Sequence, residues 1–252
     1  MKTRTLSVSP PVARYGLARI LSKRGYCSRT QAEILVRAGR VQVGSRVITD
    51  PEQGFPLEIE EIWVDGQLLA RPPRRVLLLH KPRGLLVTRQ DERGRPTIFA
   101  LLPQDGWLAP VGRLDQASSG LLLCSNDPAW AQQVLDPAQH LEKTYHVQVR
   151  PPLSSVDRRS LAAGPTVEGV SYLPMKIREL RSGGRTQWLE FQLREGKNRQ
   201  IRRLLASRDR LVLRLIRVAI GPVVLGDLPV GAWRWLEDTE IQALEGALAQ
   251  RS

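Results

Sequence analysis

The stretch GRLDQASSGLLLCSND, Gly112 to Asp127, decides how the rest of this chain is interpreted. Its apolar run, Leu121-Leu122-Leu123, is bounded by polar residues, a pattern that predicts a buried strand. Asp115 then lies where a loop enters the core, and the low dielectric there strengthens pairing with Arg113 and keeps the acid ionised. A carboxylate held in this way is a candidate nucleophile or base. The same residues also fit a surface loop with an ordinary Arg–Asp pair.

Three further segments extend the pattern along the chain. His80-Lys81-Pro82-Arg83-Gly84 precedes Asp115, whereas Glu142-Lys143-Thr144-Tyr145 and then Glu195-Gly196-Lys197-Asn198-Arg199-Gln200-Ile201-Arg202-Arg203 follow it. In this order the four segments resemble the motifs of the pseudouridine synthases, RNA-modifying enzymes built around a single aspartate. The branch they resemble most is the RsuA-type ribosomal RNA pseudouridine synthases, which carry an N-terminal S4-like RNA-binding domain.

This resemblance implies roles for particular residues. Asp115 becomes the catalytic group, which either attacks the target nucleoside or abstracts a proton from it. Tyr145 is expected to stack on the flipped base, although core packing is the alternative for an aromatic residue in an alternating strand. Arg202 is expected to pair with Asp115, and Arg113 to pair with Asp115, bind the RNA backbone, or do both. Two apolar residues of the closing motif are expected to wall the pocket, Ile201 and Leu204.

The implied reaction breaks the bond from ribose to N1 of uracil and remakes it at carbon 5. It involves no redox change and no group transfer, so no cofactor is expected. The target base must first leave its stack, which costs a few kcal/mol unless the base is already unpaired. Phosphate contacts of basic surfaces can offset that cost.

Other carboxylates compete weakly with Asp115. Asp127 follows the apolar run in an Asn-Asp-Pro turn, where a capping role is expected, and Asp105 is the other nearby acid. A glycosidase would need a second well-placed carboxylate, and the sequence offers none. The chain departs from the family pattern at Ala117-Ser118-Ser119 and at Pro128. These departures concern the specificity loop and no residue with an assigned role.

Composition favours a nucleic-acid partner. The chain has 252 residues and a formal net charge of +13, a balance that attracts polyanions. No apolar run approaches the length of a spanning helix, and the N-terminus lacks the apolar core of a signal peptide. The two cysteines, Cys27 and Cys124, and the three histidines do not cluster at metal-ligand spacing. We expect a reduced, cytoplasmic, metal-free protein with both cysteines in its core.

The basic charge is concentrated near the N-terminus. Residues 1–46 contain ten Lys or Arg and one acid, whereas residues 47–72 contain one Arg and six acids. Helices are predicted over Ala13–Ser22 and from Ser28 to Gly39, the second with a capping box to Gln31 and with Ala32, Leu35 and Ala38 buried. Hairpins are predicted at Gly44-Ser45 and at Asp65-Gly66. This pattern resembles the S4-like fold, and its expected phosphate contacts are Arg19, Lys23, Arg24, Arg29, Arg37 and Arg40.

Arg71-Pro72-Pro73-Arg74-Arg75 predicts a linker. We expect an S4-like domain over 12–72 and a catalytic domain over 75–245. In the second domain, strands are predicted at 76–79, 84–87, 145–149, 188–193 and 211–218, and helices at 199–207 and 238–250. Many strands and few helices indicate an α+β fold with a largely antiparallel sheet. The expected RNA contacts of this domain are Lys81, Lys197, Arg199 and Arg203.

The sequence therefore predicts a monomeric pseudouridine synthase acting on ribosomal RNA, as free RNA or as an assembly intermediate, with the large subunit favoured. One alternative is a non-catalytic RNA-binding or ribosome-assembly protein that keeps the scaffold. Another is a synthase that acts on small-subunit rRNA or on tRNA.

Overall fold

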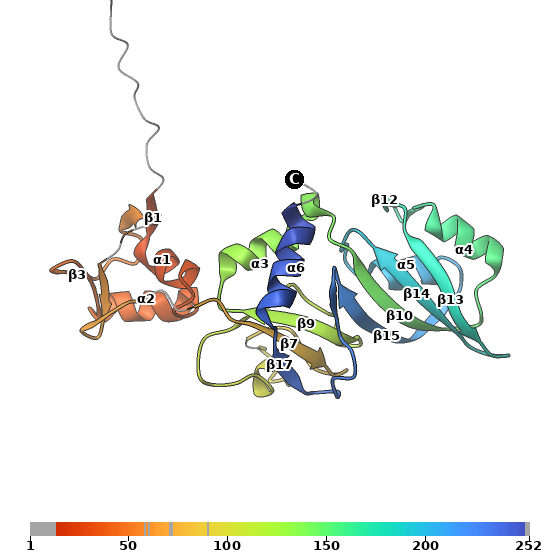
Figure 1. Cartoon of the computed structure of the whole chain (residues 1–252), viewed down its shortest axis with the longest axis horizontal. Coiled ribbons are helices and arrows are strands. Elements are labelled where there is room, and N and C mark those ends of the chain that lie inside the picture. Colours follow the sequence, from red (N-terminus) through yellow and green to blue (C-terminus); the bar gives the residue numbers. More distant parts are fainter. Residues whose placement is uncertain (1–13, 58, 60, 71–72, 90, 250–252) are drawn as a thin grey trace, which may run out of the picture. The chain divides into compact units, whose positions relative to one another are not determined.

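The structure, a computed structural model of the chain, describes residues 14–249 except 58, 60, 71–72 and 90 (Figure 1). The chain forms two compact units, and they are described separately. The first contains the described residues up to Pro73 together with Asn126–Pro128. The second contains Arg74–Ser125 and the described residues from Ala129 onward.

The first unit packs two helices against a small sheet. In chain order its elements are β1 (Arg14–Gly16), α1 (Leu17–Lys23), α2 (Arg29–Arg37), β2 (Val41–Val43), β3 (Arg46–Ile48), β4 (Gly54–Pro56), β5 (Ile62–Val64) and β6 (Gln67–Leu68). β1 pairs with β4, and the remaining strands form a sheet in the order β3-β2-β5-β6. Leu17, Ile20 and Leu21 of α1 are fully buried in the core of this unit.

Local sequence signals explain most of this unit. The Ser28 hydroxyl accepts a hydrogen bond from the Gln31 backbone N–H at 3.2 Å, and the Gln31 side chain accepts one from the Ser28 backbone, so the predicted capping box is present. Gly39 follows the helix at φ +69°, as a C-terminal glycine does. Both predicted hairpins are confirmed, as β2–β3 and β5–β6.

Two details of the helix predictions are wrong. The first helix begins at Leu17, because Arg14–Gly16 is extended and pairs with Gly54–Pro56; the predicted start, Ala13, lies outside the described residues. Ala38 is exposed, and Val36 is buried in its place. The helix turns Val36 toward the core because it lies four residues after Ala32, on the same face.

The second unit is built on one large sheet. Its strands are β7 (Val76–Lys81), β8 (Ala109–Val111), β9 (Ser119–Ser125), β10 (Lys143–Arg150), β11 (Thr166–Val167), β12 (Val170–Ser171), β13 (Lys176–Ser182), β14 (Gln187–Leu193), β15 (Leu211–Ile220), β16 (Val223–Val224) and β17 (Trp233–Trp235). Nine of these form the sheet, in the order β13-β14-β10-β15-β9-β7-β17, with β16 on β15 and β8 on β9; β11 and β12 pair separately. Only the β15–β9 pairing is parallel, so the predicted α+β class is confirmed.

Helices cover this sheet in two groups. They are α3 (Pro128–Leu135), α4 (Ser155–Ala162), α5 (Gln200–Ala206) and α6 (Asp238–Ala249), with short 3-10 helices at Ile98–Ala100 and Pro137–Gln139. Figure 1 shows α3 and α6 beside β9 and β7, and α4 and α5 beside β10, β13, β14 and β15. Trp130 of α3 and Leu244 of α6 belong to one apolar cluster with Leu121 and Leu123. The second group buries Leu161, Leu204 and Leu205 against β10 and β14.

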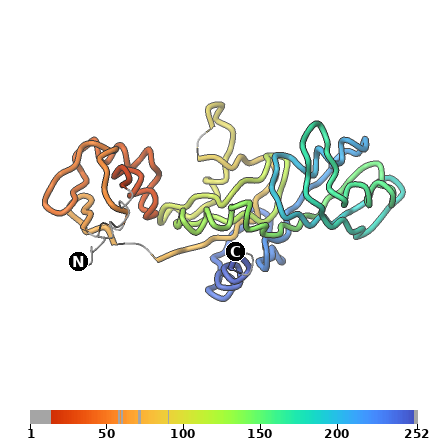
Figure 2. The backbone as a smooth tube through the Cα atoms, turned by 90° about the horizontal axis from the view of Figure 1, so that it is seen from above, coloured from red at the N-terminus to blue at the C-terminus, as the bar shows by residue number. Residues whose placement is uncertain are grey.

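The predicted strand at 84–87 is wrong. After β7 the chain enters a long loop, which Figure 2 shows standing away from the sheet, and only Leu86 makes an isolated bridge, to Thr97. The apolar side chains of Leu85 and Val87 pack against the cluster of Leu77, Leu79 and Leu122 without joining a strand. The other predicted strands and helices of this unit are confirmed with end shifts of a few residues, Gln250 lying outside the described residues.

Both cysteines are buried in apolar clusters, as expected. Across the described ranges, no helix is both long and apolar enough to span a bilayer.

The parallel contact between β9 and β15 depends on a glycine. Gly120 lies opposite Arg217 at φ +110°, and a Cβ atom added to it would be 2.2 Å from the Arg217 carbonyl oxygen and 2.5 Å from the Arg217 nitrogen. Both obstacles are backbone atoms, so a side chain cannot be accommodated by a rotamer change. This close approach joins the β7–β9 half of the sheet to the β10–β15 half.

Replacing Gly120 by alanine should therefore destabilise the second unit by roughly 2–5 kcal/mol, the sum of left-handed backbone strain and displaced strands. Urea unfolding followed by tryptophan fluorescence measures the loss. Gly94→Ala is the matched control, because Gly94 has φ +65° but nothing within 4 Å of the added Cβ. The control should cost about 1 kcal/mol. Equal costs for the two variants would show that the β9–β15 approach is not tight.

Candidate active site

Asp115 lies on a tight turn that leads from β8 into β9. The Ser118 backbone N–H donates to the Asp115 carbonyl at 3.0 Å and closes the turn. The Asp115 side chain is 34% exposed, whereas β9 beyond it is buried along nearly its whole length, as predicted from its leucines. The chain therefore passes directly from an accessible carboxylate at Asp115 into a buried strand, β9.

Lys81 ties this turn to the preceding motif. It is fully buried at the end of β7, opposite Gly120, and its Nζ donates to the carbonyls of Pro82 (3.0 Å), Asp115 (3.3 Å) and Ser118 (3.0 Å). The burial of Lys81 contradicts its expected RNA contact, because its side chain has no access to solvent. Burial lowers the pKa of Lys81 to about 8, and the charge of Asp115 acts in the opposite direction.

A second link joins the same two segments. The Gly84 backbone N–H donates to the Gln116 carbonyl at 2.8 Å, and the Gln116 side-chain amide donates to the Gly84 carbonyl at 3.0 Å. Gly84 has φ +94°, a conformation that L residues other than glycine rarely adopt. The segment 81–84 therefore holds the Asp115 turn from one side through both a side chain and the backbone.

Two arginines of the closing motif approach the Asp115 carboxylate. Arg199 Nη1 and Arg202 Nε each lie 3.8 Å from Asp115 Oδ2. Arg202 also donates to the Ala117 carbonyl at 3.2 Å and to the Ser118 hydroxyl at 3.4 Å. The pKa of Arg202 is lowered, mainly by burial and then by the charge of Arg199, while Asp115 opposes the shift. The expected Arg202–Asp115 pair is present, and Arg199 is a second cation beside it.

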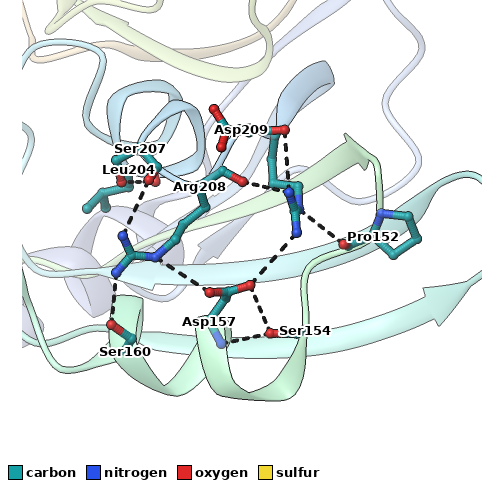
Figure 3. Close-up of polar contacts among 9 residues, drawn as sticks. Pro152, Ser154, Asp157, Ser160, Leu204, Ser207, Arg208 and Asp209 are labelled. Carbon is teal, nitrogen blue, oxygen red and sulfur yellow. Dashed lines mark hydrogen bonds and ion pairs between the residues drawn. The ribbon is translucent and has the colours of Figure 1, made fainter.

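The far end of α5, which carries Arg202, is anchored to α4 (Figure 3). Arg208 and Arg210, just beyond the helix, both approach Asp157, with nitrogen–oxygen distances of 3.7 and 3.8 Å. Arg208 also donates to the Ser160 hydroxyl at 2.9 Å, and Arg210 to the Pro152 carbonyl at 3.1 Å. These contacts fix the direction of a helix only seven residues long.

Tyr145 lies on β10, opposite Arg217 of β15. It is half-buried and packs against the apolar cluster that contains Leu114, the neighbour of Asp115. Arg217 is nearly buried and donates to the Leu121 carbonyl at 2.8 Å. The sheet therefore brings Tyr145 to the same region as the Asp115 turn, and its stacking on a base stays a prediction.

Three other expectations about site residues need correction or restriction. Arg113 is exposed, and within the described part of the chain it forms no salt bridge with Asp115. Leu204 is fully buried beneath α5, so it contributes to the core and has no surface with which to wall a pocket, and Ile201 is only 4% exposed. Asp105 pairs with Arg75 at 3.2 Å on the surface.

The remaining expected RNA contacts of this unit differ in their surroundings. Lys197 is paired with Glu195 at 3.3 Å, donates to the Ser171 carbonyl, and lies over the Tyr172 ring. Arg199 is exposed beside Asp115, and Arg203 is half-buried on α5. Sequence reasoning missed the internal role of Lys81. Its position at the end of a strand of consecutive leucines was the available signal, because a lysine that continues such a run is carried toward the core.

The expected phosphate contacts of the first unit have three kinds of surroundings, two of which, paired and not paired with an acid, are compared below. Arg40 makes a two-pronged pair with Asp65 at 2.6 and 2.7 Å, and Arg29 pairs with Glu33 and Glu52. Arg24 donates to the carbonyls of Leu57 and Ile59. The others have no acidic partner among the described residues: Arg19 and Lys23, which flank the Tyr15 ring, and Arg37, which is exposed.

The pKa of Lys81 yields a test of its internal role. Lys81→Met removes a donor from three backbone carbonyls, of which the Ser118 hydrogen bond is buried, and should cost roughly 1–3 kcal/mol. The unfolded chain keeps its lysine protonated up to about 10.5, whereas the folded chain releases that proton near 8, so the unfolded state binds more protons between these values. The unfolding free energy of the wild type should therefore rise relative to Lys81→Met from pH 8 to pH 10.5.

Urea titrations at several pH values give this difference. Lys176→Met, which replaces an exposed lysine on β13, serves as the control and should show no such rise. A wild-type minus Lys81→Met difference that is flat over this range would contradict a buried ammonium group.

Comparisons with known proteins agree with this arrangement. Residues 75–207 match the family model described as RNA pseudouridylate synthase, and residues 16–54 match the S4 domain. A ribosomal large subunit pseudouridine synthase B from Salmonella typhi is 35% identical over 239 residues, which cover 91% of this chain and 82% of that protein. The protein of the same name from Pasteurella multocida is 32% identical over 97% of this chain and 74% of its own length. A crystal structure of a pseudouridylate synthase, 27% identical, superposes with a TM-score of 0.67 and covers 91% of this chain and 99% of that one. The chain therefore belongs to the RNA pseudouridylate synthase family and carries an S4 domain at its N-terminal end.

Proposed function

We propose that this protein isomerises a uridine of ribosomal RNA, in the large subunit, to pseudouridine, with Asp115 as the group that acts on the nucleoside. The observation that carries this proposal is an accessible carboxylate on a turn that buried Lys81 and Arg202 hold from two sides. The names of the relatives supply the substrate class. The proposal extends to a monomer that acts in the cytoplasm on free rRNA or on an assembling ribosomal particle.

The reaction balances without another reactant. The bond from ribose C1′ to N1 breaks, the base turns, and C1′ bonds to carbon 5, which then loses its proton while N1 gains one. Asp115 can start this sequence by attack on the nucleoside or by removal of a ribose proton, and either route needs an ionised carboxylate. Arg202 places a positive charge 3.8 Å from that carboxylate. Because the product is an isomer of the substrate, the proposal includes no cofactor.

Tyr145 is the proposed support for the detached base. Tyr145 is half-buried and packs against two apolar clusters, one of which contains Leu114, and stacking of its ring on a flipped base would be worth roughly 1–3 kcal/mol. The base is held while its bond to ribose is absent, which keeps carbon 5 near C1′.

Asp115→Asn should abolish pseudouridine formation, because the amide keeps the size of the side chain and loses its charge and basicity. Chromatography of nucleosides from treated large-subunit rRNA transcripts, followed by primer-extension mapping, measures the product. Asp105→Asn is the control and should retain activity, since Asp105 is an exposed partner of Arg75. Substantial turnover by Asp115→Asn would assign the chemistry to another group. A wild type that binds the RNA but forms no pseudouridine would favour the non-catalytic alternative.

The two classes of basic residue in the first unit predict different effects on RNA binding. Replacing Arg19, Lys23 and Arg37 by alanine should reduce the slope of log affinity against log salt by roughly 0.7–0.9 for each lost phosphate contact. Replacing Arg29 and Arg40 should change this slope less, because their charges are already neutralised by Asp65, Glu33 and Glu52. Filter binding of an rRNA transcript at several salt concentrations compares the two sets. Equal slopes for both sets and the wild type would separate this unit from RNA binding.

A further inference from the structure

The Asp115 site carries more positive charge than its carboxylate requires. Arg199 and Arg202 both approach the same oxygen of Asp115. A third arginine, Arg83, is close enough that its charge, like that of Arg199, lowers the pKa of Arg202. Arg83 precedes Gly84, whose backbone N–H donates to the Gln116 carbonyl at 2.8 Å, so Arg83 belongs to the segment that is bonded to the Asp115 turn. Two guanidinium groups therefore approach the Asp115 carboxylate, and a third belongs to a segment attached to the same turn.

The pairing with Asp115 is also loose. Both nitrogen–oxygen distances are 3.8 Å, whereas charge-assisted hydrogen bonds are about 2.7–2.9 Å long. Elsewhere in this chain Arg158–Glu179 and Arg234–Glu240 reach 2.7 and 2.6 Å. The Arg202 Nε group is buried and has no hydrogen-bond acceptor among the described residues. Asp115 therefore leaves most of the donor capacity of these arginines unused.

The three arginines are not equivalent. Arg202 is 15% exposed and donates to Ala117 and Ser118, so it belongs to the Asp115 turn. The Arg199 side chain is 52% exposed, and Arg83 is an exposed residue whose one described bond is a long contact of 3.4 Å to the Leu213 carbonyl. Arg83 and Arg199 can therefore bind an incoming anion without disturbing the turn.

We propose that Arg83 and Arg199 bind a backbone phosphate that flanks the target uridine, leaving Arg202 as the partner of Asp115. This inference rests on the proposed function. A ribose presented to Asp115 carries a phosphate on each side, so its approach brings an anion to the two exposed guanidinium groups. The planar guanidinium matches phosphate oxygens in a two-pronged geometry. Arg83 and Arg199 would fix the position of the nucleotide and would not distinguish one base from another.

The test uses synthetic rRNA fragments that contain the uridine located by product mapping. One fragment has natural phosphates, and two others have an uncharged methylphosphonate on the 5′ or the 3′ side of that uridine. For the wild type, one of the two replacements should weaken binding by roughly ten- to a hundredfold. The double variant Arg83→Ala/Arg199→Ala should weaken binding of the natural fragment similarly and should lose no further affinity with that methylphosphonate. Each single variant should weaken binding less and keep part of the sensitivity, because the other arginine still contacts the phosphate.

Arg178→Ala is the control, because it removes an exposed arginine that pairs with Glu190 on β14. It should remain as sensitive to the methylphosphonate as the wild type. If the double variant Arg83→Ala/Arg199→Ala remains as sensitive as the wild type, or if the wild type is indifferent to both replacements, the proposed phosphate contact is refuted. Absence of pseudouridine on every transcript would instead refute the proposed function, since no target uridine could then be located.

Discussion

The ammonium group of Lys81 donates hydrogen bonds to three backbone carbonyls within the second unit. Two of these carbonyls, those of Asp115 and Ser118, begin and end the turn that presents the carboxylate. A buried carbonyl without a donor costs about 1–3 kcal/mol, and a buried ammonium without acceptors costs more. The buried ammonium group therefore requires these acceptors, and its bonds to the Asp115 and Ser118 carbonyls hold the turn that carries Asp115. The depressed pKa of Lys81 reflects the cost of placing a charge where no solvent reaches it.

Segments far apart in the chain meet at this turn. The end of β7 supplies Lys81, and the loop after it supplies Gly84. The start of α5 supplies Arg199 and Arg202, and β15 supplies the backbone that Gly120 approaches. The central sheet brings these segments together, because β9 lies between β7 and β15. The β9–β15 approach matters for function because it sets the distance between the Asp115 turn and the arginines of α5.

Much of this arrangement could be predicted from sequence, and the parts that could not have physical reasons. Apolar runs and turn residues predicted β9, α2 and both hairpins, because local periodicity and capping determine such elements. The motif order identified Arg202 as the partner of Asp115. Asp115 pairs with Arg199 and not with Arg113 because of the way α5 packs. The residues next to Asp115 in the sequence do not predict that packing. Lys81 was assigned to RNA because lysines are usually exposed, and only the tertiary structure shows that three carbonyls converge on it.

The central claim, that Asp115 on this turn modifies large-subunit rRNA, is tested most directly in cells. Pseudouridines are mapped across the rRNA of cells that lack this gene and of the same cells complemented with the wild-type protein or with Asp115→Asn. One large-subunit pseudouridine should disappear with the gene, return with the wild type and stay absent with Asp115→Asn. A map that is unchanged by loss of the gene, or one restored by Asp115→Asn, would contradict it.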